Sequence, residues 1–363
     1  IAKSCIFENG GPAYLNKTYG GAGTSLKKFT FSCWFKIGGD TIAGTSGYFP
    51  TLFNVGGESG KYFSMFIQSQ YQNIQLYSYN STYDLRKITN RTFEDPTKWY
   101  HIVCAIDTTE STGSDRVKLY IDGDRITSFS TSVDPSQDYD LSVGAAEPYY
   151  VGFMNSGDTW DGYMAEVNYV DGTALTPSTF GLTDTSTGRW IPKTLTGITY
   201  GSNGFRMQFA NSAGQTIGDD TSGNGNDFTV NNMDATDITT DSPTQNHATL
   251  QGTGGTISEG NLILVTGISD QWHHNATLKP KSGKYYAEFT CNAMGRSEVG
   301  VVSNLLVPYP TNTTRMPATP DGSIAGLMYY GYNGKVYNDS GNGTAATFNT
   351  YTTNDIIGIA LDL

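Results

Sequence analysis

The stretch FTFSCWFKI, residues 29–37, decides the fold class, because an apolar side chain occurs at every second position of it. In an extended chain this alternation places every second residue on one face, namely Phe29, Phe31, Cys33, Phe35 and Ile37. Such a pattern predicts a β-strand with one face in the core.

Further stretches of the same kind follow at 62–67, 74–79 and 99–107, each bounded by turn-forming residues. Residues 117–121 run into Asp122-Gly123, a dipeptide that favours a tight hairpin between strands. Short strands separated by regular turn signals are typical of an antiparallel sandwich and not of a parallel sheet. The sequence therefore predicts an all-β fold.

The composition limits the classes of partner. The 363 residues include 22 Lys and Arg against 34 Asp and Glu, a formal net charge of −12, and lack a basic block, which argues against nucleic acid as a partner. No apolar run approaches the ~20 residues of a membrane-spanning helix, so we expect no membrane insertion. The clearest helix signal is one turn at 176–180, with Thr176 as N-cap and Pro177 at the first helical position.

The two ends of the sequence predict a piece of a longer chain. It begins at Ile1 without Met, and it stops inside the apolar run 356–363.

The cysteines form no C-x-x-C pair, so a zinc or thioredoxin-like site is not expected. Cys33 and Cys104 can either meet across a sheet or serve as small buried apolar residues, and we favour the second interpretation. The four cysteines are Cys5, Cys33, Cys104 and Cys291.

Residues 1–180 resemble the laminin-G/concanavalin A-like family of jelly-roll β-sandwiches. The segments that carry this resemblance are FTFSCWF at 29–35, WYHIV at 99–103, LYIDG at 119–123, and DGYMAEV at 161–167 followed by ALT at 174–176. Segments 205–209 and 220–228 look like that family's opening strand and turn, yet lie after its end. We therefore predict a first domain at 1–250, with a core at 1–180 and an extension and closing strand at 181–250.

Residues 251–363 resemble the start of a second, SPRY-like β-sandwich that is incomplete at its C-terminus. Its matching segments are GKYYAEF at 283–289, VGV at 299–301 and DIIGIALD at 355–362. Together with TGRWIP at 187–192, SGNGNDF at 222–228 and TDSPT at 240–244, the combination resembles tail and other structural proteins of bacteriophages, particularly marine ones. This resemblance implies a virion surface protein whose partners are other virion subunits in a symmetric homo-oligomer and a cell-surface glycan or receptor.

Catalytic patterns are weak. Glycoside hydrolases need two carboxylates that flank one bond, and the nearest match is Glu166, Asn168 and Asp171, in which Asn168 cannot ionise. No G-x-S-x-G elbow occurs. We interpret His101 as a core or edge residue, and the adjacent His273 and His274 as part of a loop. We therefore expect a protein that is not an enzyme.

Candidate binding residues come from loops and turns. Aromatic side chains that can stack on sugars are Tyr149, Tyr150, Trp160, Trp272 and Tyr309. Calcium is the cofactor that the family resemblance implies, and its candidate oxygen ligands are Asp219, Asp220, Asn224, Asn226 and Asp227, with a smaller cluster at Asp122 and Asp124. The alternative, which we favour, is that these Asp and Asn residues build turns.

Three functions remain open on the sequence. The favoured one is a noncatalytic tail, fibre or head-appendage component that presents sandwich loops to a host glycan. The second is a capsid decoration or assembly protein that binds no glycan. The third is a glycan depolymerase, which would require converging carboxylates in a groove.

Overall fold

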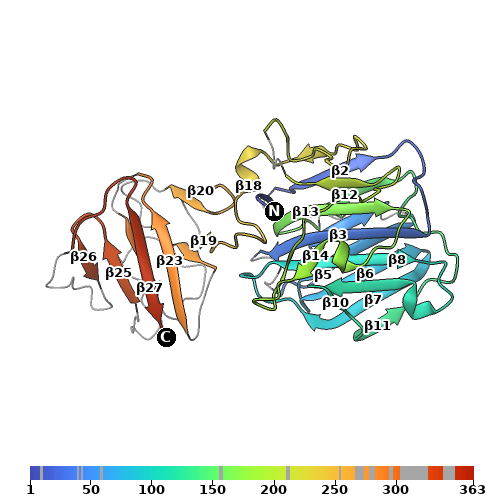
Figure 1. Ribbon diagram of the computed structural model, residues 1–363, viewed down its shortest axis with the longest axis horizontal. Coiled ribbons are helices and arrows are strands. Elements are labelled where there is room, and N and C mark those ends of the chain that lie inside the picture. The colour runs from blue at the N-terminus through green and yellow to red at the C-terminus, as the bar shows by residue number, and fades with distance from the viewer. Residues whose placement is uncertain are drawn as a thin grey trace. The chain divides into compact units, whose positions relative to one another are not determined.

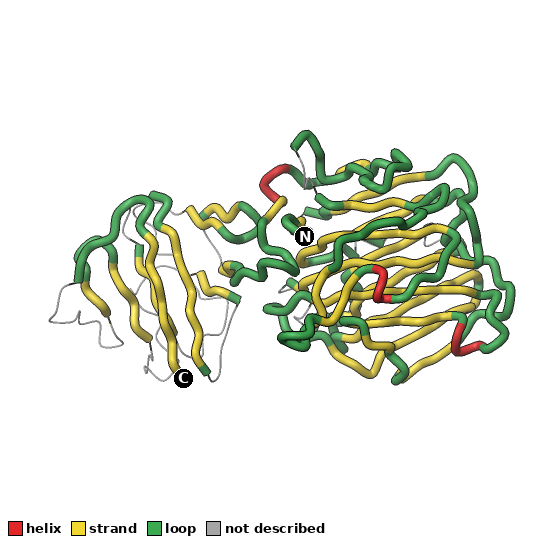
Figure 2. The backbone as a smooth tube through the Cα atoms, viewed as in Figure 1, coloured by secondary structure: helices red, strands yellow, loops and turns green. Residues whose placement is uncertain are grey.

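The computed structural model describes two units of the chain, Ile1–His247 and Ala248–Leu363. The described residues are 1–8, 11–38, 41, 44–57, 60–154, 158–209, 213–252, 255–265, 274–277, 283–293, 297–302, 326–337 and 348–363. Strands dominate both units, and the helical elements among the described residues are short 3₁₀ turns (Figure 2). One of these, η2 (Pro177–Thr179), begins with Pro177 as predicted, but the Thr176 hydroxyl contacts Ser178 Oγ and caps no backbone N–H.

The first unit is built on two eight-stranded antiparallel sheets, as the all-β prediction required (Figure 1). Sheet A runs in the order β10 (Asp124–Arg125), β9 (Val117–Ile121), β8 (Tyr100–Asp107), β3 (Lys28–Ile37), β13 (Gly162–Asp171), β1 (Ser4–Phe7) and β18 (Ile238–Thr239), with β16 (Phe205–Met207) also paired to β13. Sheet B runs in the order β11 (Phe129–Val133), β7 (Thr82–Thr92), β6 (Asn73–Asn80), β5 (Tyr62–Gln68), β4 (Thr51–Val55), β12 (Pro148–Val151), β2 (Tyr14–Thr18) and β17 (Thr229–Asn231).

The core lies between the two sheets and is rich in aromatic rings. Phe29, Phe31 and Phe35 of β3 are fully buried in it, as the alternation in that strand predicts. Phe31 stacks on Phe53 of β4 with 4.5 Å between ring centroids, which joins sheet A to sheet B. Each such side chain contributes roughly 1.5–3 kcal/mol on burial, so this layer holds the sandwich together.

The other face of β3 is also buried, which the sequence did not predict. Thr30, Ser32, Trp34 and Lys36 are each less than 5% exposed. Later chain covers them: Thr30 Oγ1 donates to the carbonyl oxygen of Thr173, and Lys36 Nζ donates to Asp241. Sheet A is therefore covered on both of its faces at β3.

Short strands that follow β13 in the sequence pair with strands of both sheets. β16 pairs with β13, β17 pairs with β2 and β18 pairs with β1, all antiparallel. These three strands are thus part of the first sandwich, and two of them, β17 and β18, pair with strands from the N-terminal end of the sequence.

All four cysteines are buried free thiols. Cys33 and Cys104 lie on the neighbouring strands β3 and β8, where burial raises the pKa of both thiols. They serve as small apolar residues of the core, which is the interpretation favoured from the sequence.

The second unit has smaller antiparallel sheets. Its strands are β19 (Leu250–Gly252) with β22 (His274–Ala276), β20 (Thr256–Ser258) with β21 (Ile263–Val265), β23 (Lys284–Thr290) with β27 (Ile356–Asp362), and β24 (Glu298–Val302), β25 (Gly326–Tyr330) and β26 (Lys335–Tyr337) in one sheet. Cys291, Tyr351 and Ile357 form its buried cluster. The SPRY-like character of this unit stays a prediction.

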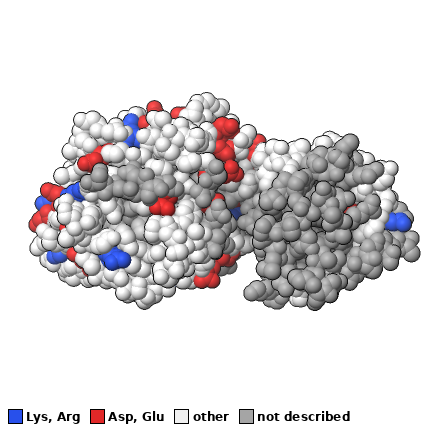
Figure 3. Space-filling view, turned by 180° about the vertical axis from the view of Figure 1, so that it is seen from behind, with Lys and Arg blue, Asp and Glu red and all other residues white. Residues whose placement is uncertain are grey.

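The surface carries few charges, in keeping with the 15% of charged residues in the chain. On the face seen in Figure 3 the charged side chains of the first unit are scattered among uncharged ones. Within the described part of the chain, no helix has the length and hydropathy that crossing a membrane requires.

Candidate functional site

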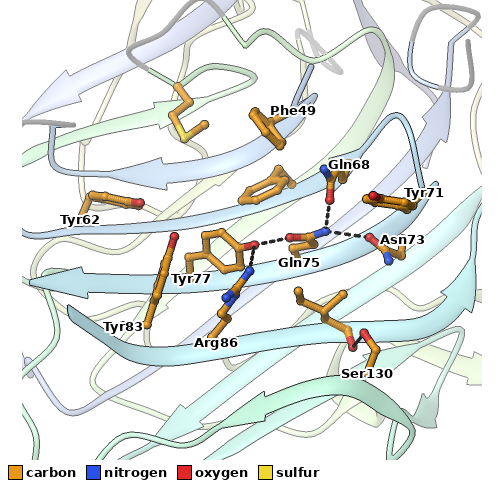
Figure 4. A pocket seen from close by; sticks show the side chains of 13 residues that line it. Phe49, Tyr62, Gln68, Tyr71, Asn73, Gln75, Tyr77, Tyr83, Arg86 and Ser130 are labelled. Atoms are coloured by element: carbon orange, nitrogen blue, oxygen red, sulfur yellow. Dashed lines mark hydrogen bonds between the residues drawn. The ribbon is translucent and has the colours of Figure 1, made fainter. Parts of the chain in front are cut away.

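A groove of about 660 Å³ lies on the outer face of sheet B, over β5, β6 and β7 (Figure 4). Its aromatic lining residues are Phe49, Tyr62, Phe66, Tyr71, Tyr77 and Tyr83. Its polar lining residues are Gln68, Asn73, Gln75, Arg86 and Ser130, and Ile88 and Met154 complete it. The described lining residues include no Asp, Glu or His.

The strand register brings these side chains to one face. Tyr77 of β6 lies opposite Ser64 of β5 and opposite Arg86 of β7. The neighbours of Tyr77 and Arg86 along their strands, Leu76 and Leu85, point to the opposite face of the sheet and are fully buried in the core. Because side chains alternate along a strand, the apolar positions fix the inner face and leave Gln75 and Tyr77 on the outer one.

A chain of hydrogen bonds holds the polar side chains in place. Gln75 Nε2 donates to Gln68 Oε1 and, at 2.9 Å, to Asn73 Oδ1. The Tyr77 hydroxyl donates to Gln75 Oε1 and accepts from Arg86 Nη2 at 3.3 Å. Both amide hydrogens of Gln75 are thereby used. The amide nitrogens of Gln68 and Asn73 donate to none of the described residues, so they are available to a ligand.

The rings form a platform beside this network. Tyr77 and Tyr83 meet edge to face with 5.1 Å between centroids. The guanidinium carbon of Arg86 lies 5.2 Å from the Tyr77 ring centroid and 4.8 Å from that of Tyr83. Tyr83 is 40% exposed and Tyr71 is 56% exposed. The groove therefore offers ring faces, hydrogen-bond donors and one positive charge, which are means of binding a polar ligand with apolar faces.

Sequence reasoning missed this groove, although strands β5 and β6 carry a signal for it. The segment IQLYSYN, 74–80, alternates core residues with Gln and Tyr, not with Lys, Glu or Thr. Outward-facing Tyr and Gln on neighbouring strands indicate a surface built for contact, because an ordinary solvent-facing strand carries small or charged residues.

Two of the predicted ligand-binding aromatics are core residues. Tyr149 and Trp160 are 0% exposed, so neither offers a ring face to a ligand and these two predictions are wrong. The reason is that Tyr149 lies in strand β12 and points inward, where its ring contacts Tyr169 at 5.5 Å and its hydroxyl accepts the Gly144 N–H. Trp160 packs edge-on against Phe35.

The other predicted aromatics differ in placement. Tyr150 follows Tyr149 and so faces the outside of sheet B, where it is half-buried. Its ring packs against Tyr14 at 6.2 Å and Phe153 at 5.5 Å, and it does not line the groove. Trp272 and Tyr309 lie outside the described residues.

The predicted calcium ligands build a turn instead. Asp220 accepts from the backbone N–H groups of Arg206, Ser222 and Asn226 at 2.8–2.9 Å and from the Ser222 hydroxyl. The remaining members are likewise engaged: Asp219 accepts from Thr216, Asp227 accepts from the Asp220 N–H, and the amides of Asn224 and Asn226 donate to the Gly204 carbonyl oxygen. Among the described residues no three His, Cys, Asp or Glu side chains gather in a way that holds a metal. The structure thus agrees with the turn interpretation favoured from the sequence, and calcium at these residues stays a prediction.

The smaller acidic cluster is engaged as well. Asp122 accepts from Lys98 Nζ at 2.7 Å and from the His101 backbone N–H at 2.9 Å. Asp124 begins strand β10 and is exposed. These residues therefore belong to the hairpin that the Asp-Gly dipeptide predicted.

The nearest match to a catalytic carboxylate pair is structural. Glu166 forms a two-pronged ion pair with Arg206, with both contacts at 2.9 Å. Asn168 Oδ1 accepts from the Tyr200 hydroxyl at 2.7 Å. Asp171 accepts the backbone N–H groups of Thr24, Ser25 and Asn203. All three side chains are buried. Glu166 ties β16 to β13, whereas Asn168 and Asp171 hold loops onto sheet A.

His101 and Ser32 form a hydrogen-bonded pair that cannot act as base and nucleophile. The Trp190 indole N–H, which only donates, contacts His101 Nδ1 at 3.0 Å. The imidazole proton of the neutral ring is therefore on Nε2, which donates to Ser32 Oγ at 2.9 Å. Burial lowers the pKa of His101 to about 3, so the ring stays neutral. Ser32 thus has no acceptor there for its proton.

The other histidines within the described residues are His247 and His274. The His247 backbone N–H donates to Asp241 at the end of the first unit, and its carbonyl oxygen accepts from Lys36. His274 lies in β22, and its neighbour His273 lies outside the described residues. The prediction of a loop at 273–274 is therefore corrected at His274, which is a strand residue.

One comparison with known proteins, a family model, bears on the fold of the first unit. Residues 9–179 match the family model of the concanavalin A-like lectin/glucanases superfamily, laminin G type. The comparison with curated proteins finds no match.

Solved structures similar to this chain include the heptameric SAP-like pentraxin of Limulus polyphemus, at 15% identity over 48% of this chain and 77% of that one, with a TM-score of 0.34. They also include the binding domain of botulinum neurotoxin serotype D (14% identity, 48% of this chain and 40% of that one, TM-score 0.33) and that of serotype G (13% identity, 64% and 65%, TM-score 0.31). This chain thus spans less than two thirds of either toxin chain. The first unit is thus a β-sandwich of two antiparallel sheets, and its residues 9–179 are similar to the concanavalin A-like lectin/glucanases superfamily.

Proposed function

We propose that this protein is a noncatalytic virion surface protein of a bacteriophage, a tail, fibre or head-appendage component, that attaches to a host-surface glycan through the groove on sheet B. The observation that carries the binding role is the make-up of this groove. It joins exposed Tyr rings to unused amide donors, and its described lining residues include no carboxylate or imidazole. The phage setting is supported by the sequence segments that resemble tail proteins.

The chemistry of the groove suits a sugar. The faces of Tyr71 and Tyr83 can pack against the C–H groups of a pyranose ring, and the amide nitrogens of Gln68 and Asn73 can donate to its hydroxyl oxygens. The hydrogen-bond chain through Gln75 fixes Gln68 and Asn73 before a ligand arrives, which lowers the entropy lost on binding.

The absence of acids from the described lining residues favours binding over cleavage. Hydrolysis of a glycosidic bond requires an acid and a second carboxylate on either side of that bond. Rings and amides supply neither group. A single groove of this kind binds a sugar weakly, and copies of it in a symmetric assembly would raise the overall affinity through effective concentration.

The test is glycan binding by the purified chain, measured on an oligosaccharide panel and then by calorimetry with the best ligand. We expect Tyr83→Ala to weaken binding about tenfold, the equivalent of about 1.4 kcal/mol. Tyr286→Ala is the matched control, because Tyr286 is 65% exposed in the second unit and should leave affinity unchanged. Immunogold labelling of the phage particle tests the location.

Three results would overturn the proposal. One is failure to bind any glycan in the panel, which would favour the decoration or assembly role. Another is an equal effect of Tyr83→Ala and the control. The third is a loss of viscosity of a sugar polymer on incubation, which would restore the depolymerase.

A further inference from the structure

We propose that the groove selects an acidic glycan, one that carries a carboxylate or a sulfate group, and that Arg86 receives this anion. The inference rests on the glycan-binding function proposed above and goes beyond it by naming the class of sugar. It starts from a charge count: among the described residues that line the groove, Arg86 alone is charged, in a chain with a net charge of −12.

Arg86 has no ion-pair partner among the described residues, in contrast to Arg206 and Arg125. Arg206 pairs with Glu166 at 2.9 Å, and Arg125 pairs with Asp115 at 3.0 Å. Arg116 donates to three backbone carbonyl oxygens at 2.8–2.9 Å. None of the ion pairs among the described residues includes Arg86. In the described part of the chain, Arg86 is thus held neither by a carboxylate nor, as Arg116 is, by backbone carbonyl oxygens, and it lines the groove.

The donors of Arg86 are largely unused. A guanidinium carries five N–H donors, and in this structure Nη2 donates to the Tyr77 hydroxyl while the buried Nε has no partner. The rings of Tyr77 and Tyr83 lie against the guanidinium and partly compensate its charge. They also fix its position and remove water from it, which strengthens its attraction to an anion.

The neighbouring groups fit the same ligand. The unused nitrogens of Gln68 and Asn73 are donors, as are the unused nitrogens of Arg86. Figure 4 shows the amides of Gln68 and Asn73 on one side of Tyr77 and the ring of Tyr83 on the other, with Arg86 close to the Tyr77 hydroxyl. Donors grouped around a cation complement an oxygen-rich anion, and a guanidinium binds carboxylate or sulfate through paired N–H groups.

The experiment compares three oligosaccharides of equal length and linkage, one neutral, one with uronate carboxylates and one with sulfate esters. Binding of each to the wild-type chain, to Arg86→Gln, to Arg86→Lys and to Arg189→Gln is measured by calorimetry at low and high salt. Arg189 is the matched control, because it is exposed and lies in the segment next to Trp190, which packs on sheet A. Thermal unfolding of each variant checks the fold.

We expect the wild type to bind one of the two acidic ligands at least about tenfold more tightly than the neutral one, with a preference that weakens as salt screens the charge. Arg86→Gln should remove this preference and leave the neutral affinity within about twofold. Arg86→Lys should keep part of it, and Arg189→Gln all of it. Whether the uronate or the sulfate ligand binds identifies the source of the anion.

Other results would overturn the inference. Equal binding of neutral and acidic ligands by the wild type would refute acidic selection while the glycan-binding function stands. Equal weakening of all three ligands by Arg86→Gln and Arg86→Lys would reduce Arg86 to a structural support. Binding of none of the ligands of this panel or of the broader one would refute the proposed function, and the inference with it.

Discussion

Replacement of Asp241 by Asn should destabilise the first unit strongly, because this carboxylate is the counter-ion of a fully buried lysine. Lys36 Nζ donates to Asp241 Oδ2 at 3.0 Å, and both side chains are 0% exposed. The same ammonium donates to Asn246 Oδ1 at 3.1 Å and to the His247 carbonyl oxygen at 2.8 Å. Asp241 Oδ1 in turn accepts from the His247 N–H. The pair therefore fastens residues 241–247 onto β3.

The magnitude follows from removing one partner of a buried pair. Asp241→Asn keeps the shape and an acceptor oxygen but leaves the Lys36 charge without compensation, which costs roughly 3–5 kcal/mol. In a unit of this size each kcal/mol lowers Tm by about 2–4 °C, so we expect a fall of about 6–20 °C. Lys36→Met should cost a similar amount, since it leaves the Asp241 carboxylate buried alone.

The assay is a double-mutant cycle by urea unfolding and calorimetry. Lys36→Met with Asp241→Asn should be more stable than the sum of the single variants predicts, because the two losses share one interaction. Limited proteolysis should cut within 241–247 faster in the single variants than in wild type. Additive costs, or an Asp241→Asn variant within about 0.5 kcal/mol of wild type, would refute this reasoning.

Three further predictions concern pH and metal. Burial lowers the pKa of Lys36, although Asp241 opposes this shift. Between that lowered pKa and the ~10.4 of an unfolded lysine, the unfolded chain therefore binds more protons than the folded one. The free energy of unfolding of wild type relative to Lys36→Met, measured in urea, should rise with pH in this window. Burial lowers the pKa of His101 to about 3, so stability should fall as pH drops from ~6.5 toward that value, a loss that His101→Gln should lack in acid unfolding curves. Asp220→Ala should cost about 2 kcal/mol by removing the acceptor of its turn, and neither calcium nor a chelator should change the Tm of wild type in calorimetry, since only a ligand that binds the folded state raises it.

The strand pattern predicted much of the first sandwich because burial against the opposite sheet enforces period-two alternation. The inward row of β3 from Phe29 to Phe35 lies in the core as the alternation requires. The same pattern failed on the outer face of that strand. Trp34 and Lys36 are covered by segments such as the one at Asp241, more than 200 residues further along the chain, and local alternation carries no information about such distant coverage.

The candidate site was harder to predict for a related reason. Tyr149 and Tyr150 are neighbours of the same residue type, yet Tyr149 is fully buried and Tyr150 faces the other side of sheet B. The face of sheet B on which each ring lies depends on the register of β12 between β2 and β4. This register is set by strand pairing and not by the two residues themselves. The turn at Asp220 also had two interpretations, and the hydrogen bond that Asp220 accepts from the Arg206 backbone N–H, 14 residues earlier in the sequence, supports the structural one.

The unequal coverage of the two sheets supports sheet B as the place of the proposed binding. At β3 and β8 the outer face of sheet A is closed by later chain, which buries Trp34 and His101. Over β5, β6 and β7 the outer face of sheet B instead carries the groove, with Tyr83 and Tyr71 exposed. Side chains on paired strands are held more rigidly than those on loops, and rigid donors bind a flexible sugar at a lower entropic cost. A glycan that contacted the connecting loops and ignored the Tyr77–Arg86 surface would contradict this argument directly, and crystals soaked with the preferred oligosaccharide would show which surface it occupies.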